Sequence, residues 1–164
     1  MKIKGKGFVI RNYREGDQES LFKNINEKYI YDNTCNVAYP YSIKIADKWV
    51  KENKNGKKQN FAIDIKGEIA GGVGFKIECH KAEIGYWLGK NYRKKGIATD
   101  SVKAFTDYGF SKLKLKRIYA YVMAHNKKSC KVLEKNGYKK EGFLRKHCSK
   151  DGRYIDAFIY AKTR

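Results

Sequence analysis

The chain has 164 residues, and its 37 Lys and Arg against 17 Asp and Glu give a formal net charge of +20. This length suits one domain, and 41% hydrophobic residues suffice for a packed core, which excludes a disordered basic tail. No stretch is apolar enough to span a membrane, and no apolar signal segment follows Met1. We therefore expect one soluble, cytoplasmic domain over residues 1–164 with no membrane partner.

The four cysteines are scattered along the chain without a CxxC motif, unlike a secreted disulfide framework. Two of them adjoin a histidine, but neighbouring strand residues point to opposite faces of a sheet, so neither pair supplies two ligands to one metal ion. We expect reduced, partly buried thiols and no metal site. The cysteines are Cys35, Cys79, Cys130 and Cys148.

The first half of the chain predicts one strand, two helices and then three strands. Residues 8–11 alternate as a strand, and residues 15–17 provide turn and N-cap chemistry for a helix. After Pro40, Ser42 can cap a second helix that ends in a polar turn over residues 51–58. Three strands follow without an intervening helix, which indicates an antiparallel meander over 59–65, 69–77 and 82–88.

The second half alternates helices with strands and ends in a hairpin. A basic loop over residues 89–96 opens a helix that begins at Ile97. Asp151-Gly152 is a hairpin turn signal. We predict an α/β fold of the α+β type, a single mixed sheet with helices on both faces. The remaining elements are a strand over 117–123, a helix over 126–136, and strands over 138–146 and 153–161.

The basic loop is a candidate phosphate site. It joins a strand to a helix, and the amides at a helix N-terminus carry unsatisfied N–H donors and the positive end of the helix dipole. Arg93, Lys94 and Lys95 add positive charge, and Gly96 permits a close turn. The alternative is a solvated basic turn that only caps the helix. Neither a Walker loop nor GxGxxG occurs.

Residues 93–98, with the sequence RKKGIA, resemble the R/Q-x-x-G-x-G/A signature of the Gcn5-related N-acetyltransferases. Other segments are similar to the RimJ/RimL-type branch of that family. They are residues 83–88, 126–129, 136–138 and 151–156. The resemblance implies one N-acetyltransferase domain, with a mostly antiparallel sheet that is splayed at the cofactor site.

The resemblance implies acetyl-CoA, or coenzyme A after transfer, as the bound cofactor. Backbone amides of the basic loop would hold the pyrophosphate with Arg93 and Lys95 beside it, and the strand before it would contact the pantetheine arm. Trp87 as an ordinary core residue is the alternative for that side chain, since it alternates with Tyr86. The cofactor-binding residues implied are Trp87, Leu88, Gly89, Arg93, Lys94, Lys95, Gly96, Ile97, Ala98, Thr99 and Asn126.

Ser129 is the candidate acid that protonates the departing thiolate. By resemblance, Asn126 holds the arm or an ordered water, although a helix start also makes it a good N-cap. Many acetyltransferases outside this branch carry a tyrosine four residues after the serine, and here that position is Leu133. A tyrosine acid at that position is excluded.

At the position of the general base, this sequence differs from the family that it resembles. Some members of the branch carry a Glu nineteen residues after the serine, and here that position is Cys148. Glu83 is our first substitute, with Glu78 and Asp64 behind it, because an attacking amine needs a carboxylate or water chain to take its proton. Glu83 as a solvated strand residue, and Cys148 as a lining thiol, remain alternatives.

The resemblance implies acetyl transfer to a primary amine, either a protein N-terminal amine of the ribosomal-protein type or a small molecule. A polycationic acceptor is disfavoured because +20 repels it. The alternative is a basic nucleic-acid or ribosome-binding protein without catalysis, and electrostatic association with ribosomes could accompany the enzyme. The family is often dimeric, so a homodimer is one expected state. The acceptor groove would be bordered by Tyr29, Tyr31, Tyr39 and Tyr41.

Overall fold

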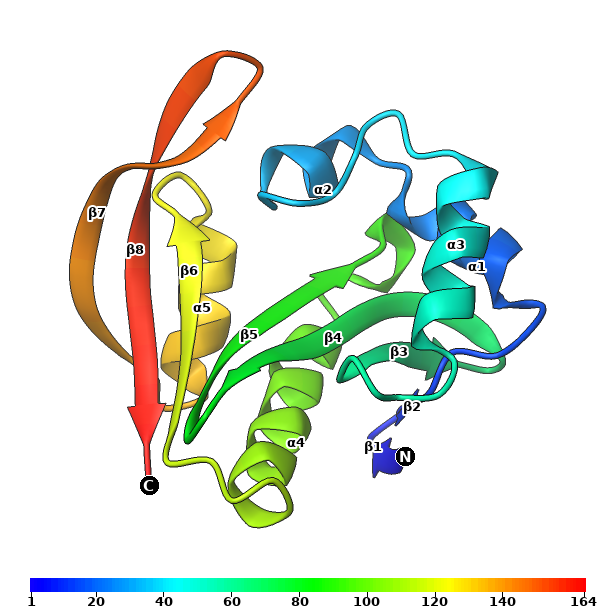
Figure 1. Cartoon of the computed structure of the whole chain (residues 1–164), viewed down its shortest axis with the longest axis horizontal. Coiled ribbons are helices and arrows are strands. Elements are labelled where there is room, and N and C mark those ends of the chain that lie inside the picture. Colours follow the sequence, from blue (N-terminus) through cyan, green and yellow to red (C-terminus); the bar gives the residue numbers. More distant parts are fainter.

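An eight-stranded mixed sheet organises the molecule in the computed structural model, which describes all 164 residues (Figure 1). The strand order is β1-β2-β3-β4-β5-β6-β8-β7. The strands are β1 (Lys2–Gly5), β2 (Phe8–Arg11), β3 (Asn60–Ile65), β4 (Glu68–Glu78), β5 (Lys81–Leu88), β6 (Arg117–Met123), β7 (Lys139–Lys150) and β8 (Arg153–Thr163). The helices are α1 (Asp17–Ile25), α2 (Lys28–Asp32), α3 (Ile43–Asn53), α4 (Ile97–Ser111) and α5 (Lys127–Lys135), with a 3-10 turn η1 (Lys90–Tyr92).

Local chemistry sets most of these boundaries as predicted. The Ser42 hydroxyl accepts the Ile45 N–H at the start of α3. Asp151 and Gly152 both have positive φ, as the tight β7–β8 turn requires. Strand β1 and the five-residue helix α2 were not predicted, because neither is long enough to show a clear period.

Helices cover both faces of the sheet, as predicted. On one face α4 and α5 pack onto the central strands, and the Phe105 ring of α4 stacks on Phe75 of β4 with centroids 4.2 Å apart. On the other face α1, α2 and α3 enclose a second apolar cluster that includes Leu21, Ala46 and Ile69. None of the helices is both long and apolar enough to cross a membrane.

Strands β5 and β6 form the sheet's one parallel pair, and they separate soon after they meet. Their pairing covers only residues 81–83 against 117–119, although β5 continues to Leu88 and β6 to Met123. Every other neighbouring pair is antiparallel. The divergence is visible at the centre of Figure 1. It confirms the predicted splayed, mostly antiparallel sheet.

Two of the cysteines are not reduced thiols, which corrects our expectation. Cys35, in the loop after α2, and Cys148, on β7, form a disulfide with their Cα atoms 6.4 Å apart. Their separation of 113 residues hides this proximity in the sequence, because only the fold brings β7 against the loop after α2. Cys79 and Cys130 are free.

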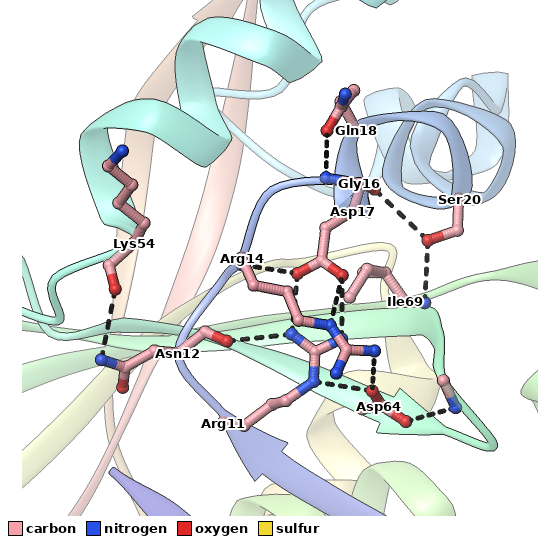
Figure 2. A network of polar contacts seen from close by, with 11 residues as sticks. Arg11, Asn12, Arg14, Gly16, Asp17, Gln18, Ser20, Lys54, Asp64 and Ile69 are labelled. Atoms are coloured by element: carbon pink, nitrogen blue, oxygen red, sulfur yellow. Dashed lines mark hydrogen bonds and ion pairs between the residues drawn. The ribbon is translucent and has the colours of Figure 1, made fainter.

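An ion-pair network ties β2, α1 and β3 together (Figure 2). The Arg11 guanidinium donates to both oxygens of Asp17, at 2.7 and 2.9 Å, and to Asp64 at 2.6 Å. Asp17 also accepts the Arg14 N–H, and Asp64 accepts the Gly67 N–H in the β3–β4 turn. The Asp17 side chain is only 3% exposed, so the pair is shielded from solvent.

We predict that Asp17→Ala lowers the free energy of unfolding by about 3 kcal/mol, because it leaves the Arg11 charge and a backbone N–H short of a buried partner. Urea denaturation measures the loss. Asp47→Ala is the control, since it removes an exposed i,i+4 partner of Lys51 and should leave the midpoint almost unchanged. Equal losses in the two variants would contradict a structural role for the network.

Candidate active site

A cavity of about 1460 Å³ occupies the space that opens between β5 and β6. It is lined by β3, β4, β5, β6 and β7, by the basic loop, by parts of α3 and α5, by the turn before β3 and by the loop after α2. Because strand side chains alternate, Glu83 and Trp87 lie on the α1–α3 face of β5, while Ile84 and Tyr86 lie on the α4–α5 face. The cavity therefore receives side chains from both faces of the sheet.

The free edge of β5 forms one wall of this cavity. Residues 84–88 pair with β4 on one side and with no strand on the other. The backbone groups that face away from β4, apart from the Leu88 carbonyl that accepts from Arg93, can hydrogen bond an extended ligand as a neighbouring strand would. Gly89 does not extend this edge, because its N–H donates to the Ala70 carbonyl and its own carbonyl accepts the Tyr92 N–H.

The Trp87 side chain lines the cavity and also packs in the core. Its indole packs against the apolar cluster under α1–α3. It crosses Gly72 of β4 so closely that a Cβ there would lie 2.5 Å from the indole Nε1. The Trp87 side chain therefore packs as a core residue, which was one of its two interpretations. Its backbone lies on the free edge of β5.

The basic loop presents a run of unpartnered amides. Gly96 is the N-cap of α4 with φ of 79°, a left-handed conformation that favours glycine, and no side chain caps the helix. The first intrahelical bond runs from the Asp100 N–H to the Gly96 carbonyl, and the N–H groups of residues 94–99 have no acceptor. Six successive free donors at a positive helix end fit an anionic group such as a phosphate.

The cations around this loop have different roles. Arg93 binds both carboxylate oxygens of Glu27, at 2.8 and 2.6 Å, donates to the Leu88 carbonyl and stacks on the Tyr29 ring. Its charge is neutralised there, so Arg93 anchors the loop instead of flanking the amides with a free charge. Lys94 is exposed, and Lys95 donates to the Asn91 carbonyl at 2.9 Å.

The start of α5 places Ser129 at the cavity. The Asn126 Oδ1 accepts the Ser129 N–H at 3.1 Å, so Asn126 is the N-cap of α5, and its Nδ2 has no protein partner. The Ser129 Oγ lies 2.7 Å from the Tyr86 hydroxyl. Leu133 is fully buried in the core, as its apolar side chain requires.

Glu83 is the only carboxylate among the residues that line the cavity. It lies opposite Lys76 across the β4–β5 pair. Burial raises the pKa of its carboxyl, and Lys76 and His147 oppose that rise in part. The other two candidate bases lie elsewhere: Glu78 pairs with Lys81 beside the β4–β5 turn, and Asp64 is held by Arg11.

The hairpin of β7 and β8 reaches the loop after α2 and closes one end of the cavity. The Tyr31 hydroxyl donates to Asp151 at 2.6 Å, and Lys150 donates to the carbonyls of Tyr31 and Thr34. The Cys35–Cys148 disulfide lies in the same place. Of the four tyrosines expected along an acceptor groove, only Tyr29 lines the cavity, and Tyr41 is buried in the core.

The structure adds two cavity residues that the sequence analysis passed over. His147 of β7 lies against the Tyr121 ring of β6 with centroids 4.3 Å apart. Tyr86 reaches Ser129 across the cavity. In the sequence His147 was weighed only as a metal ligand beside Cys148, beyond the strand predicted over 138–146, and Tyr86 was one residue of a predicted strand. The fold brings both residues to the cavity.

Comparison with known proteins gives consistent matches. Residues 8–139 match the model of the acetyltransferase (GNAT) domain family. The uncharacterized N-acetyltransferase p20 of Bacillus licheniformis is 40% identical over 111 residues, 65% of this chain and 62% of p20. The spermidine N(1)-acetyltransferase of Escherichia coli strain K12 is 30% identical over 122 residues, 73% of this chain and 66% of that protein.

A solved structure also matches almost the whole chain. The microcin C7 self immunity acetyltransferase MccE, in complex with acetyl-CoA and AMP, superimposes with a TM-score of 0.86 at 27% identity. The match covers 97% of this chain and 93% of MccE.

We predict that the Glu83 carboxyl titrates above the ordinary value for glutamate, because burial disfavours its charged form. Carbon-13 NMR of the side-chain carboxyls measures this directly. Lys76→Met should raise the pKa of Glu83 further, since it removes a favourable charge. Glu141 is the internal reference: the Arg117 hydrogen bond lowers its pKa. A Glu83 that titrates at or below Glu141 would contradict this assignment.

Proposed function

The chain belongs to the GNAT acetyltransferase family, and from that premise we propose that it transfers the acetyl group of acetyl-CoA to a primary amine through Glu83 and Ser129. The carrying observation is that these two residues enter one cavity from opposite faces of the splayed sheet. The attacking amine needs a group that takes its proton and the departing thiolate needs a donor, and one cavity holds a candidate for each.

The residues present fit acetyl-CoA. The amides of residues 94–99 suit its pyrophosphate, and Lys94 is exposed beside them. The free edge of β5 suits the amides of the pantetheine arm, which is itself an extended chain. The free Nδ2 of Asn126 is one further donor toward the arm.

The bound thioester supplies the activated acetyl group. Glu83 takes a proton from the acceptor ammonium, and its raised pKa makes it a stronger base than an exposed glutamate. Glu83 passes that proton to solvent before the attack. The amine nitrogen then attacks the carbonyl carbon and forms the C–N bond, gives its second proton to Glu83, and the C–S bond breaks. Ser129 donates its hydroxyl proton to the departing sulfur, so the products are an N-acetyl amide and a thiol.

Charge inside the cavity limits the acceptor. Glu83 is its sole carboxylate, whereas its basic lining comprises Lys57, Lys58, Lys76, Arg93, Lys94, Lys128, Lys131 and Lys135. Of these, Arg93 and Lys58 are already paired with Glu27 and Glu52. A polyamine would meet a strongly positive field with a single counter-charge. We therefore propose a protein N-terminal amine or a small monoamine as the acceptor, unlike the spermidine that the E. coli relative's name specifies.

The remaining positive charge supplies a non-specific attraction to ribosomes and other polyanions. A binding protein without catalysis would not need the unpartnered amides and the Glu83–Ser129 pair in one cavity.

Isothermal titration calorimetry with acetyl-CoA separates the enzyme from a binding protein without catalysis. The enzyme should bind acetyl-CoA at 200 mM salt, while nucleic-acid affinity falls steeply between 50 and 200 mM. No detectable acetyl-CoA binding would contradict the enzyme.

We predict that Glu83→Gln lowers kcat by at least about 100-fold across pH 6 to 9 and leaves the KM for acetyl-CoA within about twofold. Because burial disfavours the Glu83 charge, the neutral Gln should leave Tm equal or slightly higher at pH 7. Glu141→Gln is the control, since this carboxylate pairs with Arg117 outside the cavity. Full activity of Glu83→Gln would contradict its assignment as the base.

We predict that acceptor efficiency falls as positive charge is added to the amine substrate. The measurement is kcat/KM over a panel of N-terminal peptides, monoamines, spermidine and spermine at fixed acetyl-CoA. Peptides and monoamines should exceed spermine by at least about tenfold, since each added charge is repelled by the lysine-rich lining. A preference for spermine would overturn this acceptor class.

A further inference from the structure

Tyr86 and Ser129 form a hydroxyl pair inside the cavity. The Tyr86 oxygen, on β5, lies 2.7 Å from the Ser129 Oγ in the first turn of α5, and 3.3 Å from the Ser129 carbonyl. The two elements are far apart in the sequence and form no other recorded hydrogen bond. This pair therefore fixes the acid candidate from the opposite wall of the cavity.

The surroundings of Ser129 leave its hydroxyl proton free for the cavity. A helical serine often donates back to a carbonyl three or four residues earlier, and Ser129 makes no such bond. Its backbone N–H is held by Asn126. The single phenol proton can go to the Ser129 carbonyl at 3.3 Å or to the Ser129 Oγ at 2.7 Å, and at the shorter contact either oxygen can be the donor. When Tyr86 donates to the Ser129 Oγ, the serine hydroxyl proton has no protein acceptor left and is free for the cavity.

We infer that Tyr86 is a positioning residue for acetyl transfer: its phenol donates to the Ser129 Oγ and aims the serine hydroxyl at the departing sulfur. This inference rests on the proposed function and assigns a role that the motifs do not. The phenol hydrogen bond also stabilises the negative charge that develops on the serine oxygen as its proton moves.

Tyr86 neither gives up nor takes a proton during the reaction. As the C–S bond breaks, the sulfur takes the Ser129 proton, and the serine oxygen is reprotonated from solvent. The ammonium nitrogen loses two protons through Glu83 to solvent, and one solvent proton restores the serine, so the sulfur gains one proton and one proton is released overall. Burial raises the pKa of Tyr86, which keeps the phenol protonated as a donor throughout.

The chain contains a matched control. Tyr138 and Thr106 form a second hydroxyl pair, also 2.7 Å apart, buried between α4 and the start of β7 and outside the cavity. Tyr138→Phe removes the same phenol group from the same kind of bond. It should cost stability without changing kcat by more than about twofold.

The test is a double-mutant cycle on steady-state acetyl transfer. We expect Tyr86→Phe to lower kcat about tenfold with the KM for acetyl-CoA within about twofold, and Ser129→Ala to lower kcat about 100-fold. The double variant should equal Ser129→Ala, because Tyr86 acts only through the serine. Unchanged kcat in Tyr86→Phe, or losses that multiply in the double variant, would overturn the inference.

A second readout does not depend on folding of Tyr86→Phe. The carbon-13 NMR shift of the Tyr86 ring carbon that bears the hydroxyl should move in Ser129→Ala, while that of Tyr138 stays constant. An unmoved Tyr86 signal would contradict the bond.

Turnover by the wild type separates this inference from the proposed function. If the wild type transfers acetyl groups and Tyr86→Phe matches it, only this inference fails. If the wild type transfers no acetyl group, the proposed function fails as well.

Discussion

The structure depends on one interruption of strand pairing. Strands β5 and β6 run parallel and hydrogen bond for only three residues each, after which both continue without a partner between them. A strand edge in a protein interior must satisfy its N–H and C=O groups, and here these groups face a cavity instead of a neighbour. The same interruption creates the space and provides the hydrogen bonds to fill it with an extended ligand.

The neighbouring elements place their functional groups around the opening between β5 and β6. The basic loop leaves β5 where the strand ends and presents six free amides, and Arg93 secures the loop to Glu27 and Leu88. On the far wall, the N-cap of α5 holds Ser129. Because the sheet is pleated, Glu83 reaches the opening from the α1–α3 face and Tyr86 from the α4–α5 face.

Much of this arrangement could be predicted from local chemistry. Caps, turns and periodicity located every major element, because Ser42, Gly96 and Asp151-Gly152 act through bonds within a few residues of themselves. The ordered motifs also pointed to the family and the splayed sheet. The short α2 and β1 carried too few residues for a periodic signal.

Contacts between residues that lie far apart in the chain could not be predicted from the sequence. Nothing near Arg93 predicts that Glu27 neutralises it, and 113 residues separate the cysteines of the disulfide. The Tyr86–Ser129 bond spans 43 residues and follows only from how β5 faces α5. Among the three candidate bases the sequence placed Glu83 first, and the structure leaves it as the one carboxylate that lines the cavity.

The most direct test of the account is an amide NMR titration of nitrogen-15-labelled protein with coenzyme A. We predict that the largest shift changes fall on the amides of residues 94–99, which have no protein acceptor, and along residues 84–88, which pair with no strand on the side away from β4. Changes confined to the exposed lysines of β7 and other surface strands, with both segments unmoved, would contradict a ligand site between β5 and β6.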